Sequence, residues 1–272
     1  MRQLDRAVKA AAVTVAGHFG ELLQGRVGPA GVVALITLPC RALTVTARIA
    51  ASAVPHGPLS PARARILREE LGLGDPGPVH LSATMPRGGG AGASTAALVA
   101  YARLAGSHHP AAELARACVA AEGASDPLMF ATPDRLLWAS RRAEVLQDLP
   151  KLPPFDVLGG FYGPNRRTNP ADTGFADISD LIGPWVQAAS RQNLPALAAL
   201  ASQSATRNLA LRGPLPDPTA ELARATNALG YAIAHTGSAR GLLFAPGTIP
   251  PDAAAHLARQ GFRRIISFRA GG

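Results

Sequence analysis

The sequence predicts an α+β protein built from two domains. In its second half, strand and helix patterns follow one another in the order β-α-β-β-α-β, with extra helices in the first crossover. In its first half, strands precede helices, which is typical of an α+β unit. The proline-rich stretch at residues 150–154 is the best linker in the chain. We therefore expect domains at residues 1–150 and 151–272, and 272 residues are enough to give each a core.

The composition predicts a globular protein, because 47% of the residues are hydrophobic and 17% are charged. The formal net charge is +9, and all basic side chains except Lys9 and Lys151 are arginines, scattered without a run. Nucleic-acid binding favours a clustered basic patch with aromatic residues, which make up only 5% here. A solvated basic surface is the favoured interpretation, although a positive field would also suit a polyanionic nucleotide.

The cellular location follows from the apolar segments and the cysteines. No apolar run approaches the roughly 18 residues of a membrane span. The short apolar run at residues 10–16 is followed by a glycine-rich segment where a leader peptide would carry its cleavage site. Cys40 and Cys118 have neither metal-binding nor redox spacing, so both are expected to be reduced and buried. We expect a cytoplasmic protein that contacts neither membrane nor nucleic acid.

The first half carries period-2 and helical patterns separated by glycine and proline. We expect strands at residues 12–16, 32–38, 42–49 and 79–83, and helices at 61–71, 96–104 and 111–122. A glycine-bounded segment at 17–25 follows the first strand and carries His18, Glu21 and Gln24. Pro39 separates the second strand from the third. Residues 136–149 hold charged, structured sequence.

The second half shows its topology more clearly. We expect strands at residues 155–162, 231–235, 241–245 and 264–268, and helices at 178–190, 194–211, 218–229 and 252–260. This order is that of a ferredoxin-like split βαβ domain.

Residues 85–97 carry the clearest chemical signal. A strand precedes four glycines in five positions, and Ser94 and Thr95 then offer N-cap hydroxyls to a strong helix former. A glycine loop that opens a helix gathers backbone N–H groups and the positive end of the helix dipole, so the expected ligand is a phosphate. The alternative is a flexible turn. The loop lacks both the Gly-Lys-Ser/Thr ending of a P-loop and an acidic residue at Rossmann spacing.

Four segments together carry a family resemblance. The loop has the form Pro-x-x-x-Gly-x-(Gly/Ala)-x-Ser-(Ser/Thr)-Ala, and residues 17–25 have the form Gly-x-x-Gly-Glu-Leu-x-Gln-Gly. Residues 234–243 contain His-Thr-Gly, and residues 125–130 read Ser-Asp-Pro-Leu-Met-Phe. These segments resemble the motifs of the GHMP kinases, and their order along the chain is consistent with that family. The resemblance is closest to the bacterial L-threonine kinases that supply O-phospho-L-threonine for cobalamin biosynthesis.

The resemblance implies a fold, a reaction and two cofactors. The fold would combine an N-terminal domain like ribosomal protein S5 domain 2 with a ferredoxin-like C-terminal domain. The reaction would be ATP-dependent transfer of a phosphoryl group to the side-chain hydroxyl of L-threonine or a close analogue, with ATP and Mg²⁺ between the domains. The residues expected to bind the ATP phosphates are Pro86, Gly88, Gly89, Gly90, Ala91, Gly92, Ala93, Ser94 and Thr95.

The expected metal ligands and catalytic base each have a competing interpretation. Ser94 or Thr95 would place a hydroxyl on Mg²⁺, which prefers oxygen ligands, with Glu122 as the second ligand; Glu122 could instead lie on the solvated surface. Asp126 would orient or deprotonate the acceptor hydroxyl. It could instead cap a helix that begins at Pro127.

The acceptor would be a small zwitterion, a hydroxy amino acid. The residues expected to bind it are His18, Glu21, Asp172, His235, Thr236 and Gly237. Arg87, Arg166 or Arg240 could bind its carboxylate, and the sequence does not rank them. His235 could also be purely structural.

The chain departs from the threonine kinase pattern at three positions. Gly89 stands where those kinases often carry lysine, Ala93 replaces a serine and Ala97 replaces an acidic residue. A nucleotide-binding regulator with impaired catalysis is therefore the alternative function. A homodimer is compatible with the sequence.

Overall fold

The computed structural model describes residues 12–52, 58–166, 169–212 and 216–272. The beginning of the apolar run at residues 10–16 lies outside them. No helix in these ranges is long and apolar enough to span a membrane.

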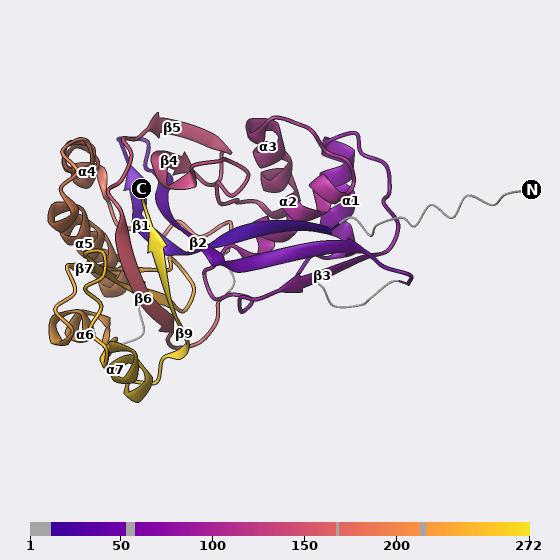
Figure 1. Ribbon diagram of the computed structural model, residues 1–272. Coiled ribbons are helices and arrows are strands. Elements are labelled where there is room, and N and C mark those ends of the chain that lie inside the picture. Colours follow the sequence, from indigo (N-terminus) through magenta and orange to yellow (C-terminus); the bar gives the residue numbers. More distant parts are fainter. Residues whose placement is uncertain (1–11, 53–57, 167–168, 213–215) are drawn as a thin grey trace, which may run out of the picture.

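One sheet of nine strands runs through the molecule. Its order is β5-β4-β2-β1-β7-β8-β6-β9, with β3 paired to β2. The strands are β1 (Ala12–Val27), β2 (Val32–Ile49), β3 (Val79–Ala83), β4 (Leu136–Ala139), β5 (Glu144–Asp148), β6 (Phe155–Phe161), β7 (Gly230–Ile233), β8 (Ala239–Phe244) and β9 (Arg263–Ala270). The long strands β1 and β2 extend between the two halves of the molecule (Figure 1).

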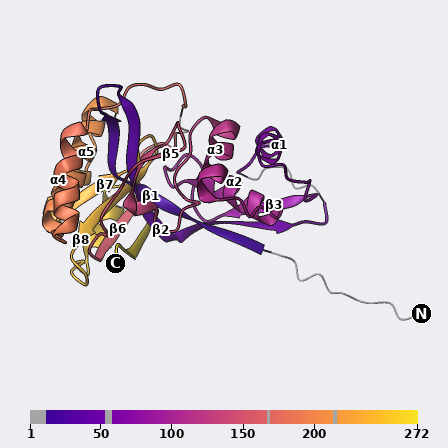
Figure 2. The same ribbon diagram turned by 90° about the horizontal axis from the view of Figure 1, so that it is seen from above.

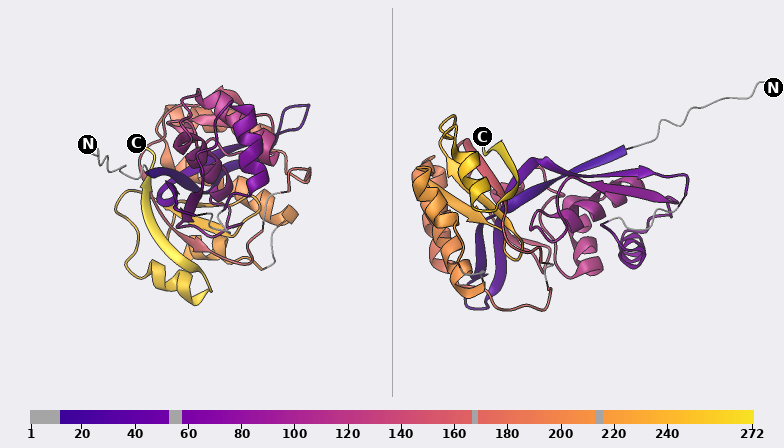
Figure 3. Two further views of the ribbon diagram at one scale, coloured as in Figure 1. Left: turned by 90° about the vertical axis from the view of Figure 1, so that its right-hand side faces the viewer. Right: turned by 90° about the horizontal axis from the view of Figure 1, so that it is seen from below.

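Helices pack on the sheet in two groups, at opposite ends of the molecule (Figure 3). The first group contains α1 (Pro61–Glu70), α2 (Ala93–Leu104) and α3 (Ala111–Glu122). The second contains α4 (Ser179–Ser190), α5 (Leu194–Arg212), α6 (Thr219–Ala225) and α7 (Ala253–Arg259). Seen from above, β1 and β2 run between the two groups (Figure 2).

The ferredoxin-like topology of the second half is confirmed. Strands β6, β7, β8 and β9 come first to fourth in the chain, and their spatial order β9-β6-β8-β7 is 4-1-3-2, with every pair antiparallel. Apolar residues of α5, α6 and α7 form one buried cluster with this sheet, including Leu222, Leu257 and Phe244. The expected helix at 218–229 is real but shorter, ending at Ala225.

Two expectations about the first strands are wrong. The first strand does not end at residue 16, because β1 continues through residues 17–25 with register shifts after Ala16, His18 and Glu21. Gly20, with φ +78°, permits this irregular backbone, and a Cβ there would lie 2.7 Å from the backbone of β7. Pro39 does not divide β2, because it faces His18 beside one of these irregularities, where a missing N–H is tolerated.

The remaining strands and helices of the first half agree with expectation. Strand β3 and helix α3 have the expected bounds, and α1 ends within a residue or two of its expected end. The charged segment at 136–149 forms the antiparallel pair of β4 and β5. The division of the chain near residue 150 stays a prediction, because β1 also pairs with β7 through Glu21 and Ile233.

Candidate active site

Most of the predicted functional residues meet in one cavity of about 590 Å³. The glycine loop, the end of α3, the irregular part of β1 and the turn after β7 form its walls. The predicted site residues that line it are His18, Glu21, Pro86, Gly88, Gly90, Ala91, Gly92, Ala93, Ser94, Thr95, Glu122, Asp126, His235 and Thr236.

The glycine loop is held in a conformation that requires glycine. Gly88, Gly90 and Gly92 all have φ near +70°. Helix α2 begins at Ala93 with Gly92 as its N-cap, so the expected capping by Ser94 or Thr95 is wrong. These two hydroxyls lie in the first helical turn, beside the cavity. The N–H groups of this turn have no partner within the helix, and together with the positive end of the helix dipole they suit an anion.

The turn after β7 supports the loop from behind. The carbonyl of Gly89 accepts hydrogen bonds from the N–H groups of Ser238 (3.0 Å) and Ala239 (2.9 Å). A Cβ at Gly237 would lie 2.2 Å from the backbone nitrogen of Gly90, so only glycine allows this approach. Gly89 and Gly237 therefore join the two glycine motifs to each other, and neither lines the cavity.

Glu122 is buried, so the alternative that it lies on the solvated surface is wrong. Its side chain is 7% exposed and accepts hydrogen bonds from the hydroxyls of Ser94 and Thr95, the latter at 3.0 Å. Burial raises the pKa of Glu122 to about 7, against the lowering effect of these two hydrogen bonds. Arg63 of α1, which the sequence did not single out, lies 3.5 Å from the carboxylate. The set of hydroxyl and carboxylate oxygens fits Mg²⁺.

Asp126 does not cap a helix. Residues 127–130 form only a turn, closed by a hydrogen bond from the N–H of Phe130 to the carbonyl of Pro127 (3.1 Å). The backbone N–H of Asp126 donates to Thr95 Oγ1 at 3.2 Å. Thr95 thus ties the candidate base to the first turn of α2, beside Glu122.

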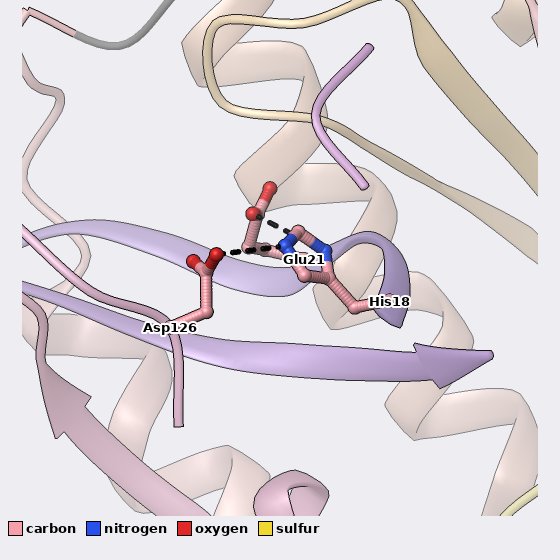
Figure 4. Close-up of side chains that lie close together, drawn as sticks. All are labelled: His18, Glu21 and Asp126. Atoms are coloured by element: carbon pink, nitrogen blue, oxygen red, sulfur yellow. Dashed lines mark ion pairs between the residues drawn. The ribbon is translucent and has the colours of Figure 1, made fainter. Parts of the chain in front are cut away.

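His18 lies between Asp126 and Glu21 (Figure 4). Its Nε2 is 3.2 Å from Asp126 Oδ2, and its Nδ1 is 3.3 Å from the carbonyl of Gly20 and 3.8 Å from Glu21 Oε1. Burial lowers the pKa of His18, but the two carboxylates and these hydrogen bonds together raise it to about 9. Burial raises the pKa of Glu21 to about 7, although His18 opposes this. Glu21 Oε2 also accepts the N–H of His235 (2.9 Å).

An aromatic and cationic group forms the other end of the cavity wall. The rings of Phe175 and His235 are 4.2 Å apart, and the guanidinium groups of Arg141 and Arg212 lie 5.1 Å and 4.8 Å from the centre of the Phe175 ring. Burial, with Arg212 and Arg141, lowers the pKa of His235 well below its usual value, so its imidazole is neutral. Arg141 and Phe175 line the cavity.

Solved structures share this architecture over their whole length. The mevalonate kinase of L. major, in complex with R-mevalonate, matches with a TM-score of 0.65 at 12% identity, covering 99% of this chain and 98% of that one. A phosphomevalonate kinase of Streptococcus pneumoniae gives 0.63 at 13%, covering 97% and 99%. A putative homoserine kinase of Listeria monocytogenes gives 0.60 at 16%, covering 96% and 97%. This chain has the GHMP kinase fold.

No protein-family model and no curated protein matches the sequence. Proteins with the GHMP kinase fold differ in their reactions. A mevalonate pyrophosphate decarboxylase of Streptococcus pyogenes also matches, with a TM-score of 0.58 at 10% identity, covering 98% of each chain. The function of this chain therefore has to be argued from its own site.

Within the GHMP kinase fold, four predicted ligand residues need comment. Asp172 is ion-paired with Arg212 and does not line the cavity. Arg240 was one of three candidates to bind the carboxylate of the acceptor, and this prediction is wrong. Its side chain is 4% exposed and forms an ion pair with the buried Asp217 at 2.9 Å. The other candidates, Arg87 and Arg166, do line the cavity.

Sequence reasoning missed Arg63, Arg141 and Phe175. Phe175 lies three residues after Asp172, a predicted ligand, and this proximity was the available signal. Neither arginine had one, because both come from segments without a motif and reach the cavity only through tertiary packing.

Proposed function

We propose that this chain is an ATP-dependent kinase that transfers the γ-phosphate to the side-chain hydroxyl of a small molecule. The acceptor that we propose is L-threonine or a close analogue, so that the product would be O-phospho-L-threonine, as in cobalamin biosynthesis. One observation carries the proposal. A carboxylate, Asp126, lies in the same cavity as a glycine loop at a helix N-terminus and is tied to that helix by Thr95.

The nucleotide side of the site is the glycine loop. The N–H groups of the loop and of the first turn of α2 would hold the β- and γ-phosphates, with the helix dipole favouring their charge. Ser94 and Glu122 would hold Mg²⁺, which would neutralise charge on the phosphates. Many phosphate-binding loops carry a lysine, but residues 85–97 contain none. Arg63, whose guanidinium lies 3.3 Å from Ser94 Oγ, would supply a cation instead.

The acceptor side is centred on Asp126. Its carboxylate would accept the hydrogen bond of the acceptor hydroxyl and orient the oxygen toward the γ-phosphorus. As the new O–P bond forms, the bond from the γ-phosphorus to the bridging oxygen of ADP breaks, and the hydroxyl proton passes to the carboxylate. Phosphoryl transfer depends mainly on such positioning and on charge neutralisation.

The choice of acceptor rests on the sequence motifs and on the polarity of the cavity. The Gly-Glu-Leu-x-Gln-Gly and His-Thr-Gly segments resemble those of threonine kinases, and both border the cavity. Glu21 could bind an α-ammonium group, and Arg87, Arg166 or Arg141 an α-carboxylate.

The test is acceptor-dependent release of ADP. L-threonine, L-serine, L-homoserine and propane-1,2-diol are offered with ATP and Mg²⁺, and the phosphorylated product is identified by ³¹P NMR. We expect L-threonine to stimulate turnover, and Asp126→Asn to lower kcat by about 100-fold or more. Asp148→Asn, an exposed carboxylate on β5, is the matched control and should leave kcat unchanged.

Two results would contradict the proposal. ATP binding without stimulation by any acceptor would support the alternative, a nucleotide-binding regulator. If Asp126→Asn leaves kcat unchanged, Asp126 is not the catalytic base.

A further inference from the structure

His18 is buried in the wall of the cavity, and oxygen acceptors occupy both of its ring nitrogens. Nδ1 faces the carbonyl of Gly20 at 3.3 Å, and Nε2 faces Asp126 Oδ2 at 3.2 Å. A carbonyl and a carboxylate can only accept hydrogen bonds, so each nitrogen has to donate one. The side chain is 2% exposed, and neither nitrogen is left for a ligand.

The backbone and the glycine loop fix the position of the ring. The N–H of His18 donates to the carbonyl of Ala91 in the loop at 3.2 Å. A Cβ at Gly92 would lie 2.6 Å from His18 Cδ2, so the ring is packed directly against the N-cap of α2. The same residue therefore touches the phosphate loop and the candidate base.

The two oxygens of Asp126 differ in their surroundings. Oδ2 faces His18 Nε2, with Thr95 Oγ1 at 3.5 Å from it. Among the described residues, none donates a hydrogen bond to Oδ1. Of the two oxygens, Oδ2 is therefore the one that the described residues hold.

We propose that His18 is a positioning residue that holds Oδ2 of Asp126 and leaves Oδ1 to accept the hydroxyl of the acceptor. This inference rests on the proposed kinase function. It replaces the expectation that His18 binds the substrate, because both ring nitrogens are engaged by the protein. His18 takes no proton from the acceptor, since it already carries one on each nitrogen.

The charges around the ring support this role. The charged groups that face His18 are Asp126 and Glu21, one on each side (Figure 4). Both favour the imidazolium form, and the pKa of His18 is raised to about 9, although burial lowers it.

The kinetic test compares His18→Leu with His18→Gln, which keeps an N–H donor. We expect His18→Leu to lower kcat roughly 10- to 100-fold with the KM for ATP nearly unchanged, and His18→Gln to restore most of the loss. His80→Leu, which removes an exposed histidine of β3, is the matched control and should have no effect. A His18→Leu enzyme with normal kcat, or one whose defect is confined to the KM for ATP, would overturn the proposal.

A double-mutant cycle separates positioning from a general structural role. If His18 acts through Asp126, His18→Leu should change kcat by less than about twofold in an Asp126→Asn background. Effects that multiply fully would show that His18 acts independently of Asp126, against the proposal.

NMR of the ring tests the contact without any turnover. In ¹⁵N-labelled protein at neutral pH, we expect both nitrogens of His18 to be protonated and the Nε2 signal to shift in Asp126→Asn. A neutral ring, or an Nε2 signal that Asp126→Asn leaves in place, would overturn the inference even if the enzyme is active. The expected spectra together with no acceptor-dependent turnover would support the contact and reject the kinase function.

Discussion

Gly92→Ala tests whether the loop and His18 pack as described. Gly92 has φ +73°, and an added Cβ would lie 2.6 Å from His18 Cδ2 and 2.8 Å from Leu128 Cδ1. Alanine in this left-handed conformation costs about 1–2 kcal/mol. Both neighbours are buried and cannot move into solvent, so overpacking adds about 1–3 kcal/mol. We expect the free energy of unfolding to fall by about 2–5 kcal/mol.

Gly28→Ala is the matched control. Gly28 has φ +66° in the turn between β1 and β2, with no atom within 4 Å of an added Cβ. The free energy of unfolding of Gly28→Ala should fall only by the conformational cost of about 1–2 kcal/mol. Urea denaturation of both variants measures the difference between their free energies of unfolding, provided that the dependence on urea concentration (the m value) is unchanged. Equal losses in the two variants would refute the packing of His18 against Gly92.

Two further predictions concern buried charges. Arg240→Met leaves Asp217 buried without its partner, so it should cost about 3–5 kcal/mol in urea denaturation. Arg269→Met breaks an ion pair whose arginine is 60% exposed and should cost less than about 1 kcal/mol; similar losses in both would contradict the burial of the first pair. The raised pKa of His18 adds stability that is complete below its unfolded value of 6.5 and is lost as the pH rises through about 9. As the pH rises from about 6 to about 9, the free energy of unfolding should therefore fall by up to about 3 kcal/mol in the wild type and by less in His18→Gln. An equal pH dependence in both proteins would contradict the charge on His18.

The C-terminal topology was predictable because its signals are local. Apolar alternation, helix periodicity and glycine turns mark β6, α7 and β9 within a few residues of their observed bounds. The order of these elements then leaves few arrangements of the sheet. The irregular part of β1 was not predictable in this way. The local strand pattern ends at residue 16, and only pairing with β2 and β7 extends the strand, with register shifts, through the glycines that follow.

The candidate site shows the same division. The loop glycines, Ser94 and Asp126 were visible as motifs because their spacing carries the chemistry. Nothing local indicates that Glu122 is buried, since a glutamate at a helix end is usually solvated. Its burial comes from the packing of α3 against α1 and α2, which brings Arg63 and the first turn of α2 around it.

The sequence by itself determined the α+β class, the order of the C-terminal strands, and the types of residue available for binding phosphate and a hydroxyl. Tertiary structure alone decided which of them meet. His18 and Asp126 are more than a hundred residues apart, and their contact at 3.2 Å joins the irregular part of β1 to the segment after α3. Arg240, chosen for its motif, faces Asp217 instead. Periodicity and spacing act over a few residues, whereas charge pairing and burial depend on which surfaces the whole chain brings together.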